Sequence, residues 1–389
     1  MLSCQKHLFS LPEDEHYLNC AQKGPFTKAT EAAGIAGIKR KSTPSGILPE
    51  HFFSEPEALR QVFAPLVNCS PEQVALIPSV SYGVAIATYN LDLKPGQNIV
   101  MPDEEFPSDV YAWRDLCART GAELRMVPRP KDIRHTGSQW SHALAEAVDE
   151  NTAALSHTII HWTDGTLFDL NLLGQKARSV GALYILDGTQ SVGALPFDFA
   201  AVKPDLLLCA AYKWLLGPYQ YGFAVVGDRL IEGRPFEFNW SNIEQSEDFS
   251  KLIHYRDGFQ PGARRFDVGE HANWIAVPML RESLRQIMAW GVENIPAYCE
   301  DLVTYLENKL AQLPGGDAFR IAPKGERAGH MFGVFLPEGA DPVRVAEVLR
   351  ERKIFVSVRG AAVRVSPHLY TTRENMDALA EGLVAAIGG

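Results

Sequence analysis

The chain has 389 residues, of which 46% are hydrophobic and 22% are charged, and its formal net charge is −10. This length favours two domains, and the acidic balance argues against nucleic acid as the main partner. The first residues are polar and acidic and no apolar run approaches membrane-spanning length, so we expect no membrane partner either.

Between about residues 55 and 230, short runs of apolar β-formers alternate with amphipathic helical patterns. Seven runs are candidate strands, at 73–77, 98–101, 122–127, 153–157, 183–186, 206–209 and 223–226. Helical patterns at 110–120 and 170–180 lie between them. This alternation predicts an α/β fold with a doubly wound sheet and right-handed crossovers.

The remainder of the chain has a different pattern. Residues 230–265 are rich in Gly, Asn, Gln and aromatics, which predicts an irregular insertion, and a long helical pattern begins at Pro278. Strand and helix patterns then mix, with helices at 302–313, 342–352 and 373–387 and strands at 319–321, 331–336, 355–358 and 362–365. This order predicts a smaller α+β domain at the C-terminus.

Cysteine is used sparsely and without a CxxC pair, at Cys4, Cys20, Cys69, Cys117, Cys209 and Cys299. Such spacing predicts neither a metal site nor a disulfide framework. A reducing, cytoplasmic location fits this usage best.

An acid and a lysine follow two of the candidate strands. The run at 183–186 stops at Asp187, and the run at 206–209 leads to Tyr212 and Lys213. Ligands of open α/β sheets bind at the carboxyl ends of the strands. A lysine that can form a Schiff base, beside an acid that keeps a pyridine nitrogen protonated, is what a pyridoxal 5′-phosphate (PLP) enzyme requires. The pair therefore predicts a PLP site.

Two further loops have alternative interpretations. Ser79, Val80 and Ser81 join a strand to a helix, where free N–H groups could bind a phosphate or a serine could simply cap the helix. Phe106, in a Phe-Pro-Ser-Asp run, could stack on a flat cofactor ring or be a packing residue.

Arg364 alternates with valines in the run 363–365, so its side chain points away from theirs. It could bind a carboxylate with two hydrogen bonds in a cleft, or be an ordinary surface arginine. The segment 262–273 contains paired arginines, and its default interpretation is a solvent-exposed loop.

In this order, the motifs resemble the class V aminotransferase family, fold type I PLP enzymes that include cysteine desulfurases, selenocysteine lyases, kynureninases and isopenicillin N epimerase-like proteins. The resemblance extends from an entry segment at 17–25 to residues 364–370. It implies a large domain with a mostly parallel seven-stranded sheet between helices and a small α+β domain. We accordingly expect an N-terminal segment packed near the active site at 1–25, a PLP-binding domain at 26–265 and a small domain at 266–389.

The resemblance also implies roles for individual residues. Lys213 would carry the cofactor and Asp187 would pair with its pyridine nitrogen. The other cofactor contacts would be Val80, Ser81 and Tyr212 at the phosphate, Phe106 on the ring and Gln190 at the phenolic oxygen. Arg364, with Asn19 of the entry segment, would bind the substrate.

Some positions depart from the family pattern. The segment 352–363 lacks the nucleophilic cysteine of desulfurases, which argues against a persulfide route. Glu270 and His271 stand where many relatives have a threonine that reaches the partner subunit's phosphate, so that contact is open and His271 or Asn273 are replacement candidates. His157 and His161 compete for one polar position, and neither is assigned to catalysis.

We therefore expect a PLP-dependent enzyme whose small-molecule substrate is an α-amino acid, on which it acts through an external aldimine and a Cα carbanion. Cleavage of a Cβ–X bond of the C–S type, without a persulfide cysteine, is slightly preferred over class V transamination or epimerisation. A homodimer is expected by resemblance. From another class, a nucleotide-binding α/β protein is the alternative, although the sequence has neither GxGxxG nor GxxxxGK[ST].

Overall fold

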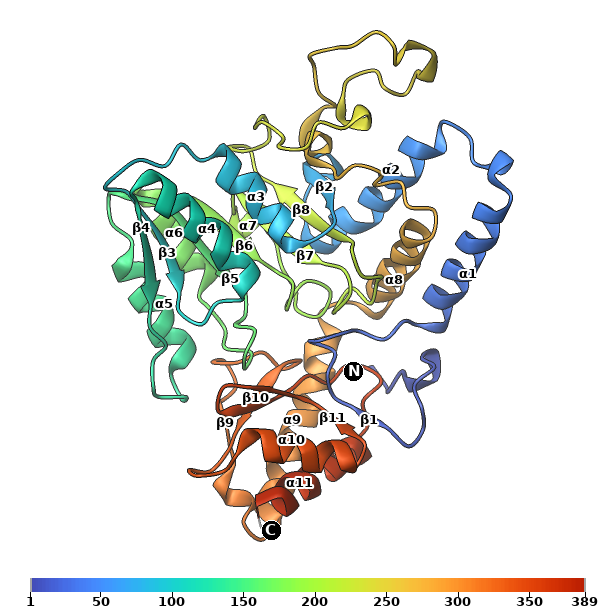
Figure 1. The fold of residues 1–389 in the computed structure, drawn as a ribbon. Helices are drawn as coiled ribbons and strands as arrows, with labels where there is room; N and C mark the ends of the chain where they lie inside the picture. The colour runs from blue at the N-terminus through green and yellow to red at the C-terminus, as the bar shows by residue number, and fades with distance from the viewer. Residues whose placement is uncertain (1, 388–389) are drawn as a thin grey trace.

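A seven-stranded sheet forms the centre of the larger lobe in the computed structural model, which describes residues 2–387 (Figure 1). Its strands are β2 (Val74–Ile77), β3 (Asn98–Pro102), β4 (Glu123–Val127), β5 (Thr152–Thr158), β6 (Leu183–Asp187), β7 (Leu206–Ala210) and β8 (Gly222–Val226). They lie in the order β2-β8-β7-β6-β5-β3-β4, and β8 runs antiparallel to both neighbours while the pairs from β7 to β4 are parallel. The predicted mostly parallel sheet is confirmed.

Helices cover both faces of this sheet. On one face, α3 (Val80–Asn90) and α4 (Pro107–Thr120) pack against alternate strand residues such as Ile99 and Leu208. On the other face, α5 (Thr136–Ala147) and α6 (Leu170–Ser179) pack against the intervening ones. Strands covered on both faces are apolar along their whole length, which explains why unbroken hydrophobic runs located them in the sequence.

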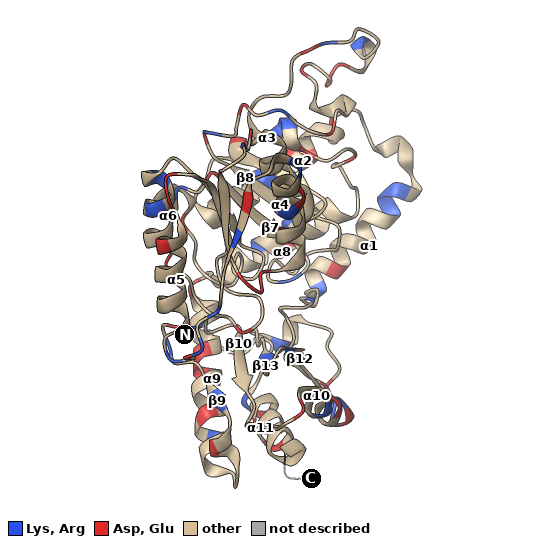
Figure 2. Ribbon diagram, turned by 60° about the vertical axis from the view of Figure 1, so that its left-hand side comes forward, with Lys and Arg blue, Asp and Glu red and all other residues tan. Residues whose placement is uncertain are grey.

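The smaller lobe contains an antiparallel sheet and three helices. The sheet order is β12 (Ser357–Arg359), β13 (Ala362–Val365), β10 (Phe332–Phe335) and β9 (Arg320–Ile321). The helices are α9 (Asn294–Gln312), α10 (Pro342–Glu351) and α11 (Arg373–Ile387). This mixture agrees with the α+β pattern expected at the C-terminus. Acidic and basic residues are interleaved along α9 and α10 (Figure 2).

Three helices extend the larger lobe. The helix α8 (Ala276–Trp290), whose pattern was expected from Pro278, packs against α1 (Lys28–Ser42) and α2 (His51–Phe63). Its last residue, Trp290, also packs against His368 of the smaller lobe, with ring centres 5.8 Å apart. The expected division after residue 265, which places α8 in the small domain, remains a prediction. No helix within residues 2–387 is long and apolar enough to span a membrane.

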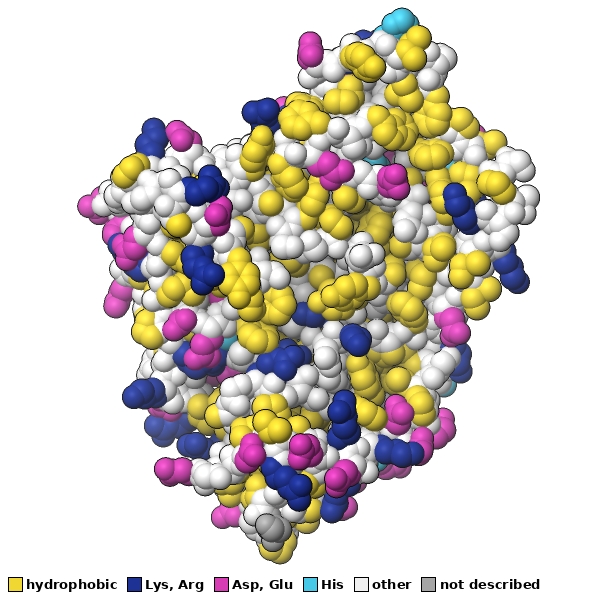
Figure 3. All heavy atoms as spheres, in the orientation of Figure 1, with side chains coloured by type: hydrophobic (Ala, Val, Ile, Leu, Met, Phe, Trp, Pro, Cys, Tyr) yellow, Lys and Arg dark blue, Asp and Glu magenta, His cyan; other side chains and the backbone are white. Residues whose placement is uncertain are grey.

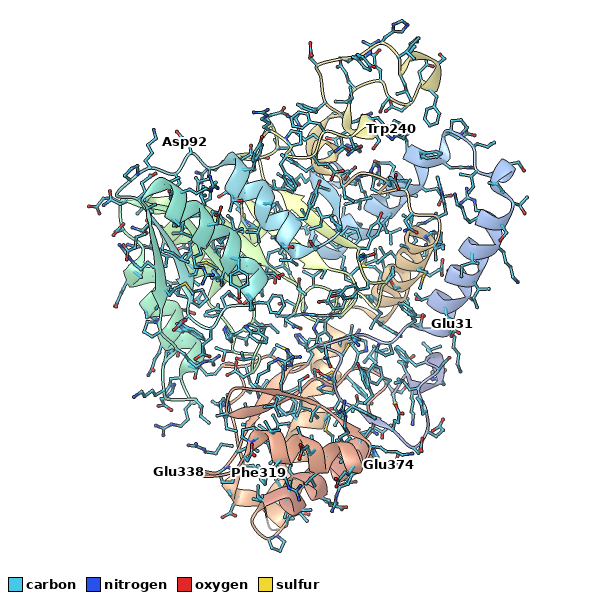
Figure 4. All side chains as sticks on the ribbon, in the orientation of Figure 1. Glu31, Asp92, Trp240, Phe319, Glu338 and Glu374 are labelled. Carbon is cyan, nitrogen blue, oxygen red and sulfur yellow. The ribbon has the colours of Figure 1, made fainter. Side chains whose placement is uncertain are left out.

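The predicted irregular insertion contains only short 3₁₀ turns, at Trp240–Asn242, Phe249–Lys251 and Gly262–Phe266. Much of it projects from the larger lobe at the top of Figure 1. Trp240, labelled in Figure 4, lies at the base of this projection. The projection therefore carries apolar side chains into solvent, among them Ile253 and Tyr255.

The N-terminal segment contacts both lobes. Strand β1 (His16–Tyr17) pairs in parallel with β11 (Ile354–Phe355) of the smaller lobe. A few residues later, Gly24 N–H donates to the Tyr212 carbonyl at 2.9 Å. The segment thus passes the turn that carries Lys213.

Candidate active site

Asp187 and Lys213 lie at the carboxyl ends of neighbouring strands. Strands β6 and β7 pair in parallel with Asp187 opposite Leu208, and Lys213 comes shortly after the end of β7 at Ala210. Both side chains line a cavity of about 400 Å³. The structure therefore brings the predicted pair together at the sheet edge where ligands of α/β proteins bind.

The Lys213 amine is buried, with 7% of the residue exposed. Burial is the main cause that lowers its pKa from 10.5 to about 8; Asp187 opposes this change and the positive charge of Arg364 reinforces it. The Nζ atom lies 5.5 Å from the ring centres of Phe106 and of Tyr212. A substantial fraction of this amine is uncharged near pH 8, and the uncharged amine is the nucleophile that attacks a carbonyl carbon.

Asp187 of the cavity lining interacts with two further buried carboxyl groups, Glu105 and Asp109. Asp187 Oδ1 accepts the Thr189 N–H at 2.8 Å, and Glu105 accepts from Thr158 N–H and Oγ1 at 3.0 and 3.1 Å. Asp109 has no protein donor to its Oδ2 atom. Burial, then the charges of Asp187 and Glu105, hold the pKa of Asp109 well above its usual range. Sequence reasoning missed Asp109, although it ends the quoted Phe-Pro-Ser-Asp run.

The turn into α3 has two different parts. Ser79 is the N-cap, because its Oγ accepts the Tyr82 N–H at 3.2 Å, and it also contacts Ser81 Oγ at 2.9 Å. Val80 and Ser81 occupy the first turn, where N–H groups have no helical partner. Ser79, Val80 and Ser81 all line the cavity. Capping and anion binding are therefore compatible, because different residues supply them.

Aromatic rings form the walls of the cavity. Phe106 precedes α4 and meets Trp162 edge to face at 5.4 Å between ring centres. Tyr212 packs against Tyr219 at 4.4 Å. All four residues line the cavity. The sequence patterns did not identify Trp162, because its place in the wall depends on tertiary contacts.

Arg364 and Asn19 come from the smaller lobe and the entry segment. Arg364 is 1% exposed, its Nη1 donates to the Trp162 carbonyl at 2.7 Å, and its Nε has no partner. Asn19 is buried, accepts from Ser357 Oγ at 2.9 Å and donates to Gln22 Oε1 at 2.7 Å. Trp162 lines the cavity, so the hydrogen bond from Arg364 to Trp162 and the burial of Arg364 place this arginine beside the cavity rather than on the outer surface.

Gln190 lines the cavity, but its amide is already hydrogen-bonded. Its Nε2 donates to the Ala21 carbonyl at 3.2 Å and its Oε1 accepts from Trp214 Nε1 at 2.9 Å. The contact of Gln190 with a cofactor oxygen therefore remains a prediction.

Neither of the two competing histidines lines the cavity. His157 is bonded to Thr158 O and Tyr184 Oη at 2.7 and 3.2 Å. His161 Nδ1 lies 2.8 Å from both Arg129 Nη2 and Thr163 Oγ1. Burial is the main cause that lowers the pKa of both, so both are neutral at physiological pH. Their contacts assign them to packing and loop positioning.

Glu270, His271 and Asn273 line a different cavity of about 480 Å³, beside Phe52 and Trp240. His271 Nδ1 lies 3.1 Å from the Val268 carbonyl. In the described chain these residues and Lys213 therefore belong to separate cavities, and a contact of His271 or Asn273 with a partner's phosphate remains a prediction.

The donor set suits PLP. A buried amine can hold its aldehyde carbon, a carboxylate can pair with its ring nitrogen, an aromatic ring can cover its face and the first turn of a helix can take its phosphate. On a doubly wound α/β fold, this combination defines a PLP-dependent enzyme. The chain belongs to the class V aminotransferase family, which matches residues 48–379. The nucleotide-binding alternative is accordingly wrong.

Known proteins agree with this assignment. The chain is 27% identical to isopenicillin N epimerase of Streptomyces clavuligerus, over 85% of this chain and 84% of that protein. It is 26% identical to a cysteine desulfurase of Escherichia coli, over 81% and 78%. In structure, it is similar to the cystine C-S lyase C-DES in complex with its product cysteine persulfide, with a TM-score of 0.85, 20% identity and coverage of 95% and 97%. In another structure, C-DES has glycine covalently linked to the PLP cofactor.

Proposed function

We propose that this PLP-dependent enzyme cleaves a Cβ–S bond of an α-amino acid without forming a persulfide on the protein. The observation that carries the proposal is the lining of the Lys213 cavity, which includes no cysteine among the described residues. Cys20 and Cys209 are buried, and burial raises the pKa of both thiols above the usual value of 9.0. A persulfide route needs an accessible, readily ionised thiol. The structural likeness to a cystine C-S lyase supports the same reaction.

In this proposal each side chain has a separate task. Val80 and Ser81 would hold the phosphate, Phe106 would cover one ring face and Asp187 would keep the ring nitrogen protonated. When bound, PLP supplies an electron sink for the pair left at Cα. Lys213 would hold the cofactor and then move the Cα proton, because its lowered pKa suits a general base. Arg364 would orient the α-carboxylate.

The overall reaction balances without an oxidant or reductant. Lys213 takes the proton from Cα, a double bond forms between Cα and Cβ, and sulfur leaves Cβ with the bonding pair and then takes a proton. Water then replaces the amino group, so an amino acid and water give pyruvate, ammonia and a thiol or persulfide. The departing sulfur does not need a proton from a general acid of the protein, because a thiolate is a stable leaving group near neutral pH.

Product analysis tests the proposal. Purified enzyme with PLP is incubated with cysteine, cystine and S-substituted cysteines, and pyruvate, ammonia, sulfide and alanine are measured. We expect equal amounts of pyruvate and ammonia, and no product from Lys213→Ala. Alanine with a protein-bound persulfide would instead indicate a desulfurase. A keto acid with the carbon skeleton of the substrate, formed with transfer of its amino group, would indicate a transaminase.

Epimerisation is a second candidate, because the chain is similar in sequence to an isopenicillin N epimerase. It would use the same proton removal by Lys213, followed by return of the proton to the opposite face of Cα. Chiral analysis of recovered amino acid separates the two, since an epimerase produces the other enantiomer without pyruvate.

We also propose a homodimer. Hydrophobic side chains gather at the upper right of Figure 3, over α1, α2 and the projecting segment. The exposed hydrophobic residues of α1 and of the projecting segment include Ile35, Ile38, Ile253 and Tyr255, the last 97% exposed. Apolar patches of this kind mark contact surfaces. Light scattering is expected to give twice the mass of 43.0 kDa; a monomer would contradict the proposal.

We propose a cytoplasmic location as well. The six cysteines are all unpaired, which supports this location.

A further inference from the structure

Two arginines share one face of the hairpin that β12 and β13 form. Ser357 pairs with Arg364 across the hairpin, and Arg359 pairs with Ala362. Arg359 lies two residues after Ser357, so it points to the same face as Ser357 and Arg364. Diagonal neighbours of this kind are about 7–8 Å apart, within the reach of long side chains.

Neither guanidinium is neutralised. Both Nε atoms are buried without a hydrogen-bond partner. The hydrogen bonds that the two side chains do make go to neutral carbonyls, from Arg359 Nη1 to Val358 O and from Arg364 Nη1 to Trp162 O, both at 2.7 Å. Among the described residues, no carboxylate forms an ion pair with either group. Two buried or half-buried like charges are costly to keep side by side unless an anion binds between or beside them.

The pair lies next to the Lys213 cavity. The Arg359 Cζ atom is 5.4 Å from the ring centre of Trp162, which lines that cavity. The positive charges of Arg364 and Arg359 both act on Lys213. Arg364 is already required for the α-carboxylate under the proposed function, so Arg359 is a surplus cation at the same site.

We propose that Arg359 binds a second anionic group, on the side chain of the substrate. The substrate class is then an α-amino acid whose side chain ends in a carboxylate or a group of similar charge and shape. This inference rests on the proposed function, because it assumes that Arg364 holds the α-carboxylate. Trp162 would form the wall between the two charged ends, with Arg359 stacked against its ring.

Matched acids and amides test this inference. The holoenzyme is titrated with aspartate and asparagine, glutamate and glutamine, and S-carboxymethyl-cysteine and S-carbamoylmethyl-cysteine, and the dissociation constants are measured from the cofactor absorbance. We expect at least one acid to bind about tenfold or more tightly than its amide, the factor that a charge-assisted hydrogen bond supplies. In Arg359→Gln, the ratio of the dissociation constants of amide and acid is expected to fall to near one.

Two further variants separate charge recognition from a structural effect. Arg359→Lys keeps the charge and is expected to retain part of the preference for the acid. Arg350→Gln, on the exposed surface of α10, removes a charge of the same lobe and is expected to leave the ratio unchanged. Equal melting temperatures and cofactor content would show that the variants are folded.

The possible failures are distinguishable. If the wild-type enzyme shows no preference in any pair, or if Arg359→Gln keeps the preference, the inference is wrong while the proposed function stands. If none of the six amino acids perturbs the absorbance of protein that holds PLP on Lys213 while cysteine or cystine still gives pyruvate, the inference is wrong and the proposed function stands. If cysteine and cystine give no pyruvate either, both fail.

Discussion

Asp187 and Asp109 are buried carboxyl groups, and the negative charge of Asp187 disfavours a charge on Asp109. Two neighbouring buried carboxyl groups rarely ionise together, so one of them keeps a proton. Burial, then the charges of Asp187 and Glu105, raise the pKa of Asp109 well above its usual range. Burial also raises the pKa of Asp187, but hydrogen bonds from Thr189 and the charge of Lys213 oppose this rise. We therefore expect the proton on Asp109 and the negative charge on Asp187, where it can pair with a protonated ring nitrogen.

The proton on Asp109 makes the stability of the protein depend on pH. A group whose pKa is higher in the folded state stabilises the fold below its unfolded value, here near 3.8, and loses this contribution as the pH rises. We expect Asp109→Asn to increase the free energy of unfolding at pH 7 relative to the wild type, and the difference to shrink towards pH 4. Urea denaturation across this range measures it. Asp115→Asn, at an exposed position of the same helix, should show no such trend.

Incorporation of PLP into the apoenzyme should follow the ionisation of Lys213. Its pKa is lowered to about 8, so the uncharged amine increases as the pH rises through this value. We expect the rate of cofactor uptake, measured by absorbance after PLP is removed and added back, to increase between pH 7 and 9 and then level off. Arg364→Gln removes a repelling charge and should move the midpoint to higher pH. A midpoint that stays in place would contradict the proposed interaction.

Arg364→Gln should also weaken substrate binding. Loss of a charge-assisted hydrogen bond to a carboxylate costs about 1.5–3 kcal/mol, which corresponds to an increase in KM of roughly 10- to 100-fold. The cofactor absorbance should remain, because Arg364 does not line the cavity that contains Lys213 and Asp187. Steady-state kinetics measure the effect for any α-amino acid substrate. Unchanged KM would remove Arg364 from the substrate site.

The loop that carries Trp162 depends on a close approach at Gly165. A Cβ atom there would lie 2.0 Å from the Met331 carbonyl oxygen, and the residue has φ of +77°. Gly181 has the same φ, but its Cβ would meet nothing within 4 Å. We expect Gly181→Ala to cost about 1–2 kcal/mol of unfolding free energy for the left-handed backbone alone, and Gly165→Ala to cost more. Urea denaturation of the two variants isolates the steric contact with Met331, and equal losses would contradict it.

The sequence was sufficient for the sheet and for much of the site, for a physical reason. Strands buried on both faces are continuous apolar runs, and the acid and lysine that end two such runs must lie at one sheet edge.

The helix α1 was not anticipated, because small residues form its contacts: a Cβ on Gly34 would lie 2.8 Å from Met279 Sδ. A helix that packs through glycine has few regularly spaced hydrophobic residues, so its sequence lacks the pattern from which an amphipathic helix is predicted.

Contacts between distant segments were beyond reach of the sequence patterns. Trp162 enters the cavity wall because Arg129 holds its loop, with Nη1 at 2.8 Å from Asp164 Oδ2 and Nη2 at 2.6 Å from Thr163 Oγ1. The surplus charge of Arg359 becomes evident only when the hairpin register places it beside Arg364. Neither relationship has a local signature, since each joins residues from separate elements.

The entry segment is a mechanical link between the two lobes. Asn19 is bonded to Ser357 of the hairpin that carries the arginines, and Gly24 is bonded to the carbonyl of Tyr212, next to Lys213. A rotation of the smaller lobe would therefore pull on the turn that presents the lysine. Under the proposed roles, a few residues of main chain would therefore connect the substrate-binding arginines to the reactive amine.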